Sequence, residues 1–173
     1  MKTLTNISLA CLCAAAVFVS CDKNDSDNNA GNTLNTRDRN FISQVSLSNS
    51  AEIQEGTLAS TTGEDSAVKA FGLMMVTEHT TAQNDLKALG TGVNIHVTDS
   101  VDASHTSLLD SLGTLIGRGF DSVYIMSQIA DHQAAIAAFQ AEISSGSHAK
   151  VTDYANKYLP KIQMHLATAD SIA

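Results

Sequence analysis

The sequence is poor in cysteine, proline and aromatic residues. Its 173 residues include 3 Cys, 1 Pro and no Trp, and only 5% of the side chains are aromatic. The cysteines are Cys11, Cys13 and Cys21, so the chain beyond them has no residue for a disulfide, a cysteine metal site or a thiol nucleophile. A domain formed by that later part must therefore depend on its apolar core for stability.

Positive charge is also scarce, and it is not clustered. The chain has 10 Lys and Arg against 18 Asp and Glu. Binding to nucleic acids or to anionic lipid headgroups requires clustered basic side chains, so we expect neither. The chain also lacks a glycine-rich phosphate loop and a Gly-x-Ser-x-Gly motif, and no residue is predicted to be catalytic. These absences favour a protein that is not an enzyme.

The first twenty residues have the pattern of an export signal. Lys2 precedes an uncharged stretch whose apolar core, residues 7–19, is shorter than the roughly 20 residues needed to span a bilayer. The segment Phe18-Val19-Ser20-Cys21 resembles the lipobox of bacterial lipoproteins, in which the cysteine receives a lipid. The alternative is an ordinary secretory signal with a chance cysteine.

The lipobox predicts a lipid-anchored protein in three parts. Residues 1–20 are the expected signal peptide, residues 21–37 the lipidated Cys21 with a disordered polar tether, and residues 38–173 the folded domain. The tether is assigned as disordered because it has almost nothing to bury. We expect the lipid to hold the protein at the bacterial cell envelope, at the outer membrane or cell surface rather than the inner membrane.

Apolar residues spaced three and four apart predict an all-α domain. The expected helices cover residues 36–60, 66–89, 102–115, 120–143 and 150–169. Four long helices, with the short one in the crossover between the second and third, indicate a four-helix bundle. The first apolar stripe passes through Phe41, Val45 and Ser48, and Thr36 or Asp38 is the expected N-cap.

Four local features add detail to the predicted arrangement of helices. Pro160 should kink the last helix or separate two segments. Residues 117–119, Gly-Arg-Gly, are expected to form a hinge, and residues 93–97 a short extended piece. Residues 41–52 and 120–131 are faintly alike, as a duplicated helical hairpin would leave them.

Polar residues interrupt the apolar stripe near the middle of each long helix. They are Glu52, His79, His132 with the adjacent Asp131, and His165. An unpaired polar group costs about 1–3 kcal/mol when buried, so these side chains should meet one another, a water or a metal. Carboxylate and imidazole ligands suit Fe, Mn, Zn or Cu, so the five residues predict a divalent metal site in the bundle core.

Two other interpretations of these residues remain open. The buried polar groups would only fix the register of the helices in a structural or protein-interaction lipoprotein without metal. A complete di-iron centre would need Glu-x-x-His motifs, but Val76 and Ile162 stand three residues before His79 and His165, so a mononuclear site is favoured. Six further acidic and histidine residues are predicted to lie on the surface or in loops: Glu55, Glu78, Glu142, His96, His105 and His148.

A set of motifs across residues 38–172 resembles the bacterial domain of unknown function 4142. The residues that carry the resemblance are Phe41, Glu52-Ile53, Leu58-Ala59, Phe71, Met75, Glu78-His79, residues 117–124, Asp131-His132, Leu159-Pro160 and His165. The resemblance implies a ferritin-like helical bundle in an exported or membrane-anchored bacterial protein. It implies no reaction, because the family has no established activity, and a ferritin-like fold does not by itself imply iron chemistry.

Overall fold

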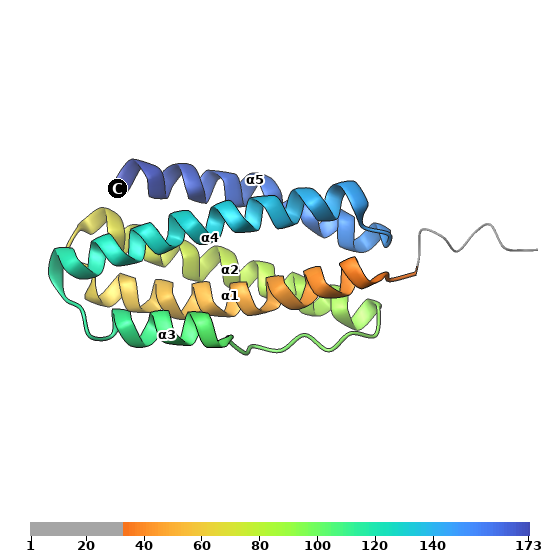
Figure 1. The fold of residues 1–173 in the computed structure, drawn as a ribbon, viewed down its shortest axis with the longest axis horizontal. Helices are drawn as coiled ribbons and strands as arrows, with labels where there is room; N and C mark the ends of the chain where they lie inside the picture. The colour runs from red at the N-terminus through yellow and green to blue at the C-terminus, as the bar shows by residue number, and fades with distance from the viewer. Residues whose placement is uncertain (1–32) are drawn as a thin grey trace, which may run out of the picture.

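The computed structural model describes residues 33–173, which form five α-helices and contain no strand. The helices are α1 (Thr36–Thr62), α2 (Ser66–Gly92), α3 (Ala103–Leu112), α4 (Gly117–Ser145) and α5 (Ala149–Ile172). The four long helices lie side by side, and α3 lies in the connection between α2 and α4 (Figure 1). This confirms the predicted all-α four-helix bundle with a short helix in its crossover.

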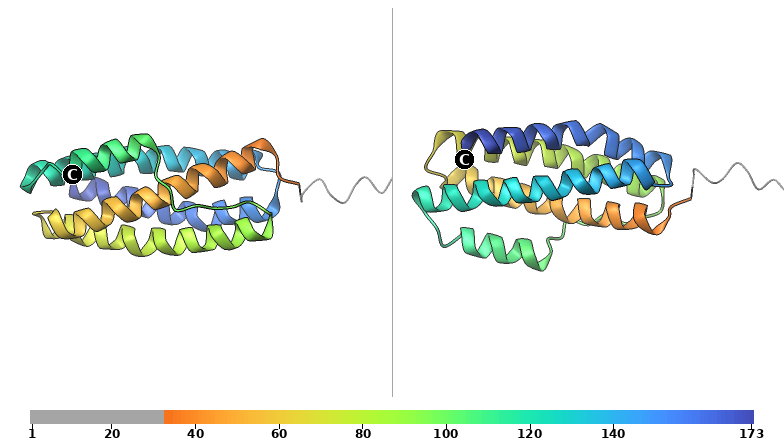
Figure 2. Two further views of the ribbon diagram at one scale, coloured as in Figure 1. Left: turned by 90° about the horizontal axis from the view of Figure 1, so that it is seen from below. Right: turned by 45° about the horizontal axis from the view of Figure 1, so that its top comes forward.

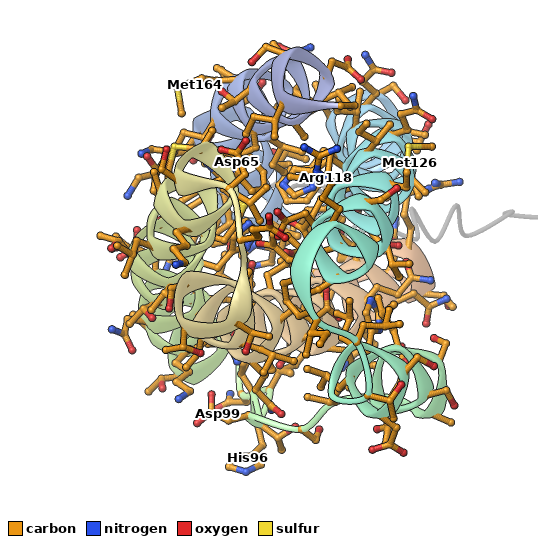
Figure 3. All side chains as sticks on the ribbon, turned by 90° about the vertical axis from the view of Figure 1, so that its left-hand side faces the viewer. Asp65, His96, Asp99, Arg118, Met126 and Met164 are labelled. Carbon is orange, nitrogen blue, oxygen red and sulfur yellow. The ribbon has the colours of Figure 1, made fainter. Side chains whose placement is uncertain are left out.

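The bundle consists of two antiparallel hairpins, α1–α2 and α4–α5. Across the hairpins α1 packs on α4 and α2 packs on α5 (Figure 3). The connection from α2 returns along the length of the bundle before α4 begins (Figure 2). One long crossover of this kind is typical of ferritin-like bundles. Within residues 33–173, none of the helices is both long and apolar enough to cross a membrane. The predicted signal peptide, Cys21 and most of the tether lie outside the described residues.

Acidic and amide side chains begin three of the helices. Asn35 is the N-cap of α1 and forms a capping box with Asp38, so the predicted cap at Thr36 or Asp38 was wrong. Asp65 caps α2 and Asp102 caps α3 by accepting hydrogen bonds from backbone N–H groups. Each cap satisfies N–H groups that the first turn of a helix leaves without partners.

The structure corrects three local predictions. The expected hinge at residues 117–119 is the first turn of α4, where Gly117 has φ of 60°, a value that favours glycine. Pro160 lies inside α5, which continues through it, so the two-segment alternative was wrong. Residues 95–102 of the crossover are irregular, and no strand forms at residues 93–97.

Two aspartates hold the hairpins together reciprocally. Asp38 of α1 accepts hydrogen bonds from the backbone nitrogens of Ser147 (2.9 Å) and His148 (3.3 Å) in the α4–α5 turn. Asp121 of α4 accepts hydrogen bonds from Glu64 (3.0 Å) and Asp65 (2.8 Å) in the α1–α2 turn. Each hairpin therefore supplies the carboxylate that accepts hydrogen bonds from the turn of the other hairpin.

The reciprocal contacts reveal the register of an internal repeat. Positions 38 and 121 stand as far apart in the sequence as positions 63 and 146, the glycines that end α1 and α4. The same separation relates three buried pairs: Val68 with Val151, Phe71 with Tyr154, and Met75 with Tyr158. In this register Phe41 corresponds to Tyr124, so the likeness inferred from residues 41–52 and 120–131 was misaligned by four positions.

The apolar core is divided into two clusters. One, near the start of α1 and the end of α4, includes Phe41 and Phe139, whose ring centres are 4.8 Å apart. The other, near the end of α1 and the start of α4, includes Phe71, Phe120 and Tyr124. Both clusters draw residues from all four long helices, and a layer of buried polar side chains lies between them.

Candidate metal centre

The polar layer contains all five residues that the sequence predicted for a metal site. Four of them, Glu52, His79, His132 and His165, are buried, and Asp131 is half-buried. The structure separates the five into two neighbouring groups. The three histidines form one group, and Glu52 and Asp131 form the other together with Glu55.

The three histidine rings converge from α2, α4 and α5. Their ring centres are 5.3, 5.4 and 5.9 Å apart, and one nitrogen of each ring lies within 4.8 Å of the others. The closest pair, His132 Nε2 and His165 Nδ1, is separated by 3.3 Å. Nitrogens bound tetrahedrally at about 2.1 Å from a metal stand about 3.4 Å apart, with ring centres about 5.2 Å apart. The cluster is therefore close to the size of a three-histidine metal site.

The second nitrogen of each ring faces an acceptor. His79 Nδ1 lies 2.9 Å from Asn49 Oδ1, and His132 Nδ1 lies 2.8 Å from the carbonyl oxygen of Gln128. His165 Nε2 lies 3.4 Å from Glu78 Oε2, an ion-pair distance, but makes no hydrogen bond within residues 33–173. These acceptors leave His79 Nε2, His132 Nε2 and His165 Nδ1 on the side where the rings converge. Metal-binding histidines are typically held in this way.

Asn49 determines which nitrogen of His79 carries the proton. Its Nδ2 group lies 3.3 Å from Gln83 Oε1 and 3.4 Å from the Tyr154 hydroxyl, so Oδ1 is the atom turned toward His79. His79 Nδ1 must then donate to Asn49. The Nε2 atom keeps its lone pair, and it has no hydrogen-bond partner within residues 33–173.

Glu78 has the corresponding role for His165. Lys161 Nζ lies 2.9 Å from Glu78 Oε2, and this contact is the largest cause of a lowered pKa at Glu78. The ionised carboxylate favours a proton on His165 Nε2. With that proton on Nε2, His165 Nδ1 and His132 Nε2 both direct lone pairs toward a cation; with the proton on Nδ1, His165 donates to His132 across 3.3 Å.

The buried position of the cluster keeps its rings neutral. Burial lowers the pKa of His79 well below its usual value, and the nearby His132 and His165 lower it further. Burial, followed by the charge of His165, lowers the pKa of His132 to about 4. Burial also lowers the pKa of His165, against the opposing effect of Glu78. Neutral imidazole is the form that binds metal, so the ligands are ready near neutral pH.

Three carboxyl groups lie next to the histidines. Oxygens of Glu52, Glu55 and Asp131 lie within 4.8 Å of one another, and Gln128 Nε2 donates to Glu55 over 3.1 Å. Burial is the main cause that raises all three pKa values, and that of Glu55 reaches about 7. Glu52 Oε1 is 4.0 Å from His132 Nδ1, so the two groups adjoin.

A cavity of about 320 Å³ reaches both groups. Glu52, His79, Asp131 and His132 line it, together with apolar residues of α1 and α4 such as Val45 and Phe139. Asp102 and His105 at the start of α3 also line it, and they are linked by a 2.9 Å contact between His105 Nδ1 and Asp102 Oδ1. Space is thus available beside the histidines for a water molecule or a small ligand.

The six residues predicted for the surface or for loops differ in exposure, and two of them, Glu78 and His105, are half-buried. His96 is exposed on the crossover and points away from the bundle (Figure 3). Glu55 and Glu142 are buried within helices, so their predicted surface positions were wrong, whereas His148 is buried but lies in the α4–α5 turn, as the loop alternative allowed. Glu142 and His148 lie at the end of the bundle where Asp38 meets the α4–α5 turn, outside the metal centre.

Three residues of the centre were missed in the sequence. Asn49, rather than the predicted Ser48, lies in the core next to His79, and Gln128 and Glu55 are also buried. A helical signal was present, because Asn49 follows Val45 by four positions and Gln128 precedes His132 by four. Spacing could therefore have placed these residues on the inner face, although not beside particular partners.

These features define a ferritin-like four-helix bundle with a buried histidine and carboxylate centre. The model of the family "Domain of unknown function (DUF4142)" matches residues 23–172, and the chain belongs to this family. A crystal structure of a DUF305 fragment from Deinococcus radiodurans has the same fold, with a TM-score of 0.70 and 11% identity. The alignment covers 80% of this chain and 96% of that chain. Among curated proteins no sequence matches.

Proposed function

We propose that this protein is a lipid-anchored protein of the bacterial cell envelope that binds one transition-metal ion in its bundle core. The proposed ligands are His79, His132 and His165. The observation that supports them is the convergence of three ring nitrogens whose opposite ring nitrogens each face an acceptor. A bound cation would take the place of the proton that His132 and His165 can otherwise share.

The three imidazole ligands allow the candidate metals to be ranked by expected affinity. Three neutral imidazoles suit Zn, Cu and Fe better than Mn, which binds nitrogen ligands most weakly among these ions. The cavity beside His79 and His132 has room for a further ligand such as water. The proposed role is metal binding without turnover, since no residue of the chain is assigned to catalysis.

Metal loading tests this proposal directly. The purified protein is stripped with a chelator, reloaded separately with Zn(II), Cu(II), Fe(II) and Mn(II), desalted and measured by elemental analysis. We expect about one equivalent of Zn or Cu per chain, lost in His79→Ala and in His165→Ala while circular dichroism shows the helices intact. His96→Ala, which removes an exposed histidine outside the centre, is the matched control.

Two results would contradict the metal proposal. Binding that is equal in the parent, His79→Ala and His165→Ala would place the metal elsewhere. If no metal is retained by the parent, the polar layer only orders the helices, and the search for a function moves to protein partners in the envelope.

The lipid anchor is supported by the segment that ends at Cys21 and is tested in cells. Cys21→Ala should move the protein from the membrane fraction to the soluble fraction, because the lipid is its proposed attachment. Cys13→Ala, which lies within the proposed signal peptide, should leave the protein with the membranes. A Cys21→Ala protein that stays in the membrane fraction would show that the anchor is not this lipid.

A further inference from the structure

Buried polar atoms without hydrogen-bond partners are concentrated at one place in the bundle. Nine such side-chain atoms occur within residues 33–173. Four of them belong to neighbouring side chains of α1 and α4: Glu52 Oε2, Glu55 Oε1, Gln128 Oε1 and the Tyr124 hydroxyl. A buried polar group without a partner costs free energy, so four together indicate that a ligand completes this region.

Within residues 33–173 no lysine or arginine pairs with these carboxylates, and His105, whose charge acts on Glu55 and Asp131, is in contact with Asp102. The lysines that form ion pairs in the described chain do so elsewhere, Lys87 with Asp99, Lys157 with Asp85 and Lys161 with Glu78. The histidine nearest to Glu52 is His132, and its Nδ1 is already turned toward the Gln128 carbonyl. His105 supplies at most one positive charge against these three carboxylates and Asp102, so further positive charge is needed if the three carboxylates are ionised.

The donor atoms specify the kind of cation. Glu52, Glu55 and Asp131 offer six carboxylate oxygens, and Gln128 offers an amide oxygen, whereas the histidine cluster offers only nitrogens. Oxygen ligands prefer hard cations such as Mn²⁺, Mg²⁺ and Ca²⁺. The cavity lined by Glu52 and Asp131 provides a route from the surface, and the acidic Asp102 also lines it.

We infer that Glu52, Glu55 and Asp131 form a second cation site, which binds a hard divalent cation beside the histidine site. Its ligands come from α1 and α4 only, and it shares no residue with the three histidines. The second site therefore stands whether or not the histidines bind a metal. If both sites fill, the protein holds two chemically different cations in adjacent positions of one core.

Mn(II) is a suitable probe, because the six-line electron paramagnetic resonance signal of the aqueous ion is lost on binding. The metal-free protein is titrated with Mn(II) in five forms: the parent, Glu55→Gln, Asp131→Asn, His165→Ala and Asp110→Asn. We expect the parent to bind one equivalent and the Glu55 and Asp131 variants to bind at least about tenfold more weakly. His165→Ala and the exposed control Asp110→Asn should match the parent.

The variants separate failure of this site from failure of the histidine site. If the parent binds no Mn(II), or if Glu55→Gln and Asp131→Asn bind like the parent, the carboxylate site is wrong. If His165→Ala loses Mn(II) as strongly as they do, a single mixed site exists, which overturns this inference and leaves core metal binding intact. Circular dichroism of each variant shows whether its helices persist, and the half-buried Asp131 is the milder of the two positions to replace.

Discussion

The two hairpins are alike at their ends and different in their middles. At the ends Asp38 and Asp121 have the same role, and Phe71 matches Tyr154 in the core. In the middle the matching positions diverge, because Asn49 stands where α4 has His132 and His79 stands where α5 has Ile162. The α4–α5 hairpin supplies two histidines and Asp131, whereas the α1–α2 hairpin supplies one histidine and two glutamates.

This difference separates the residues that build the bundle from those of the candidate metal centre. Aspartates of the same role meet the same capping requirement at both ends, although the buried Glu142 matches the apolar Ala59. The middle has one candidate centre shared by both hairpins, to which each would contribute different ligands. Substitutions at matching positions of the two hairpins should therefore have matching effects at the ends and different effects in the middle.

The largest effect is expected at the reciprocal aspartates. Asp38→Ala leaves three backbone N–H groups without acceptors and Asp121→Ala leaves two, and each should cost about 3 kcal/mol in the free energy of unfolding. Urea unfolding measures the loss, with the exposed Asp153→Ala as the control. If only one of the two variants is destabilised, the two aspartates do not contribute equally to the stability of the bundle.

The next effect concerns the distance between helices. A methyl group at Gly72 would lie 2.7 Å from the Gly56 carbonyl oxygen on α1, and the matching position in the other hairpin is the buried Ala155. Gly72→Ala should cost about 2 kcal/mol through overpacking, and Ala155→Gly about 1 kcal/mol through lost helix propensity. Gly119→Ala, which meets nothing within 4 Å, should be neutral or slightly stabilising in the same thermal unfolding measurement. A Gly72→Ala protein as stable as the parent would show that the close contact is not required.

A pH effect of similar or smaller size is expected at Glu142, which matches the apolar Ala59. Burial and the nearby Asp38 raise the pKa of Glu142 to about 7, so the folded state keeps a proton that the unfolded state releases from about pH 4.5 upward. Stability is therefore lost as the pH rises from about 4.5 to about 7. Glu142→Gln should remove this loss and be more stable than the parent above pH 7 by roughly 1–2 kcal/mol. Urea unfolding at pH 4.5, 6 and 8 measures how the free energy of unfolding changes with pH in each protein. The same change in the parent and in Glu142→Gln would contradict this prediction.

The smallest effect is expected at Asn49, which positions His79 and does not bind the metal in the proposal. Asn49→Ala should weaken metal binding about tenfold with the stoichiometry unchanged, because His79 loses the acceptor that orients it. Asn49→Asp keeps an acceptor oxygen and should restore the affinity. Ser48→Ala, at the neighbouring half-buried position, is the control in a competition titration with a chromophoric chelator. Equal affinity in Asn49→Ala and Ser48→Ala would exclude the positioning role.

Sequence patterns predicted the helices of this fold well. Spacings of three and four located all five helices, because an amphipathic helix must repeat at about 3.6 residues. The same spacing placed His79 and His132 on the inner faces of α2 and α4. The cap at Asn35 was missed because several residues near it can serve as caps, and only the backbone geometry selects one of them.

The metal centre was only partly predictable. Glu55 and Glu142 were placed on the surface because charged side chains are almost never fully buried, and the bundle buries both. The acceptors Asn49, Glu78 and the Gln128 carbonyl come from three different helices. The Gln128 carbonyl is one turn before His132 on the same helix, but the positions of Asn49 and Glu78 beside their histidines depend on how different helices are rotated and packed, and the periodicity of one helix does not contain that information.

The reciprocal contacts of Asp38 and Asp121 have the form of an isologous interface, in which each partner presents the same patch to the other. The α4–α5 turn donates to an acceptor on α1, and the α1–α2 turn donates to an acceptor on α4. Each of these two contacts joins one hairpin to the other, so neither contact can form before the hairpins dock. Both apolar clusters also require all four long helices. Folding of the domain should consequently be cooperative, with the docking of the hairpins as the step in which most of its tertiary stability appears.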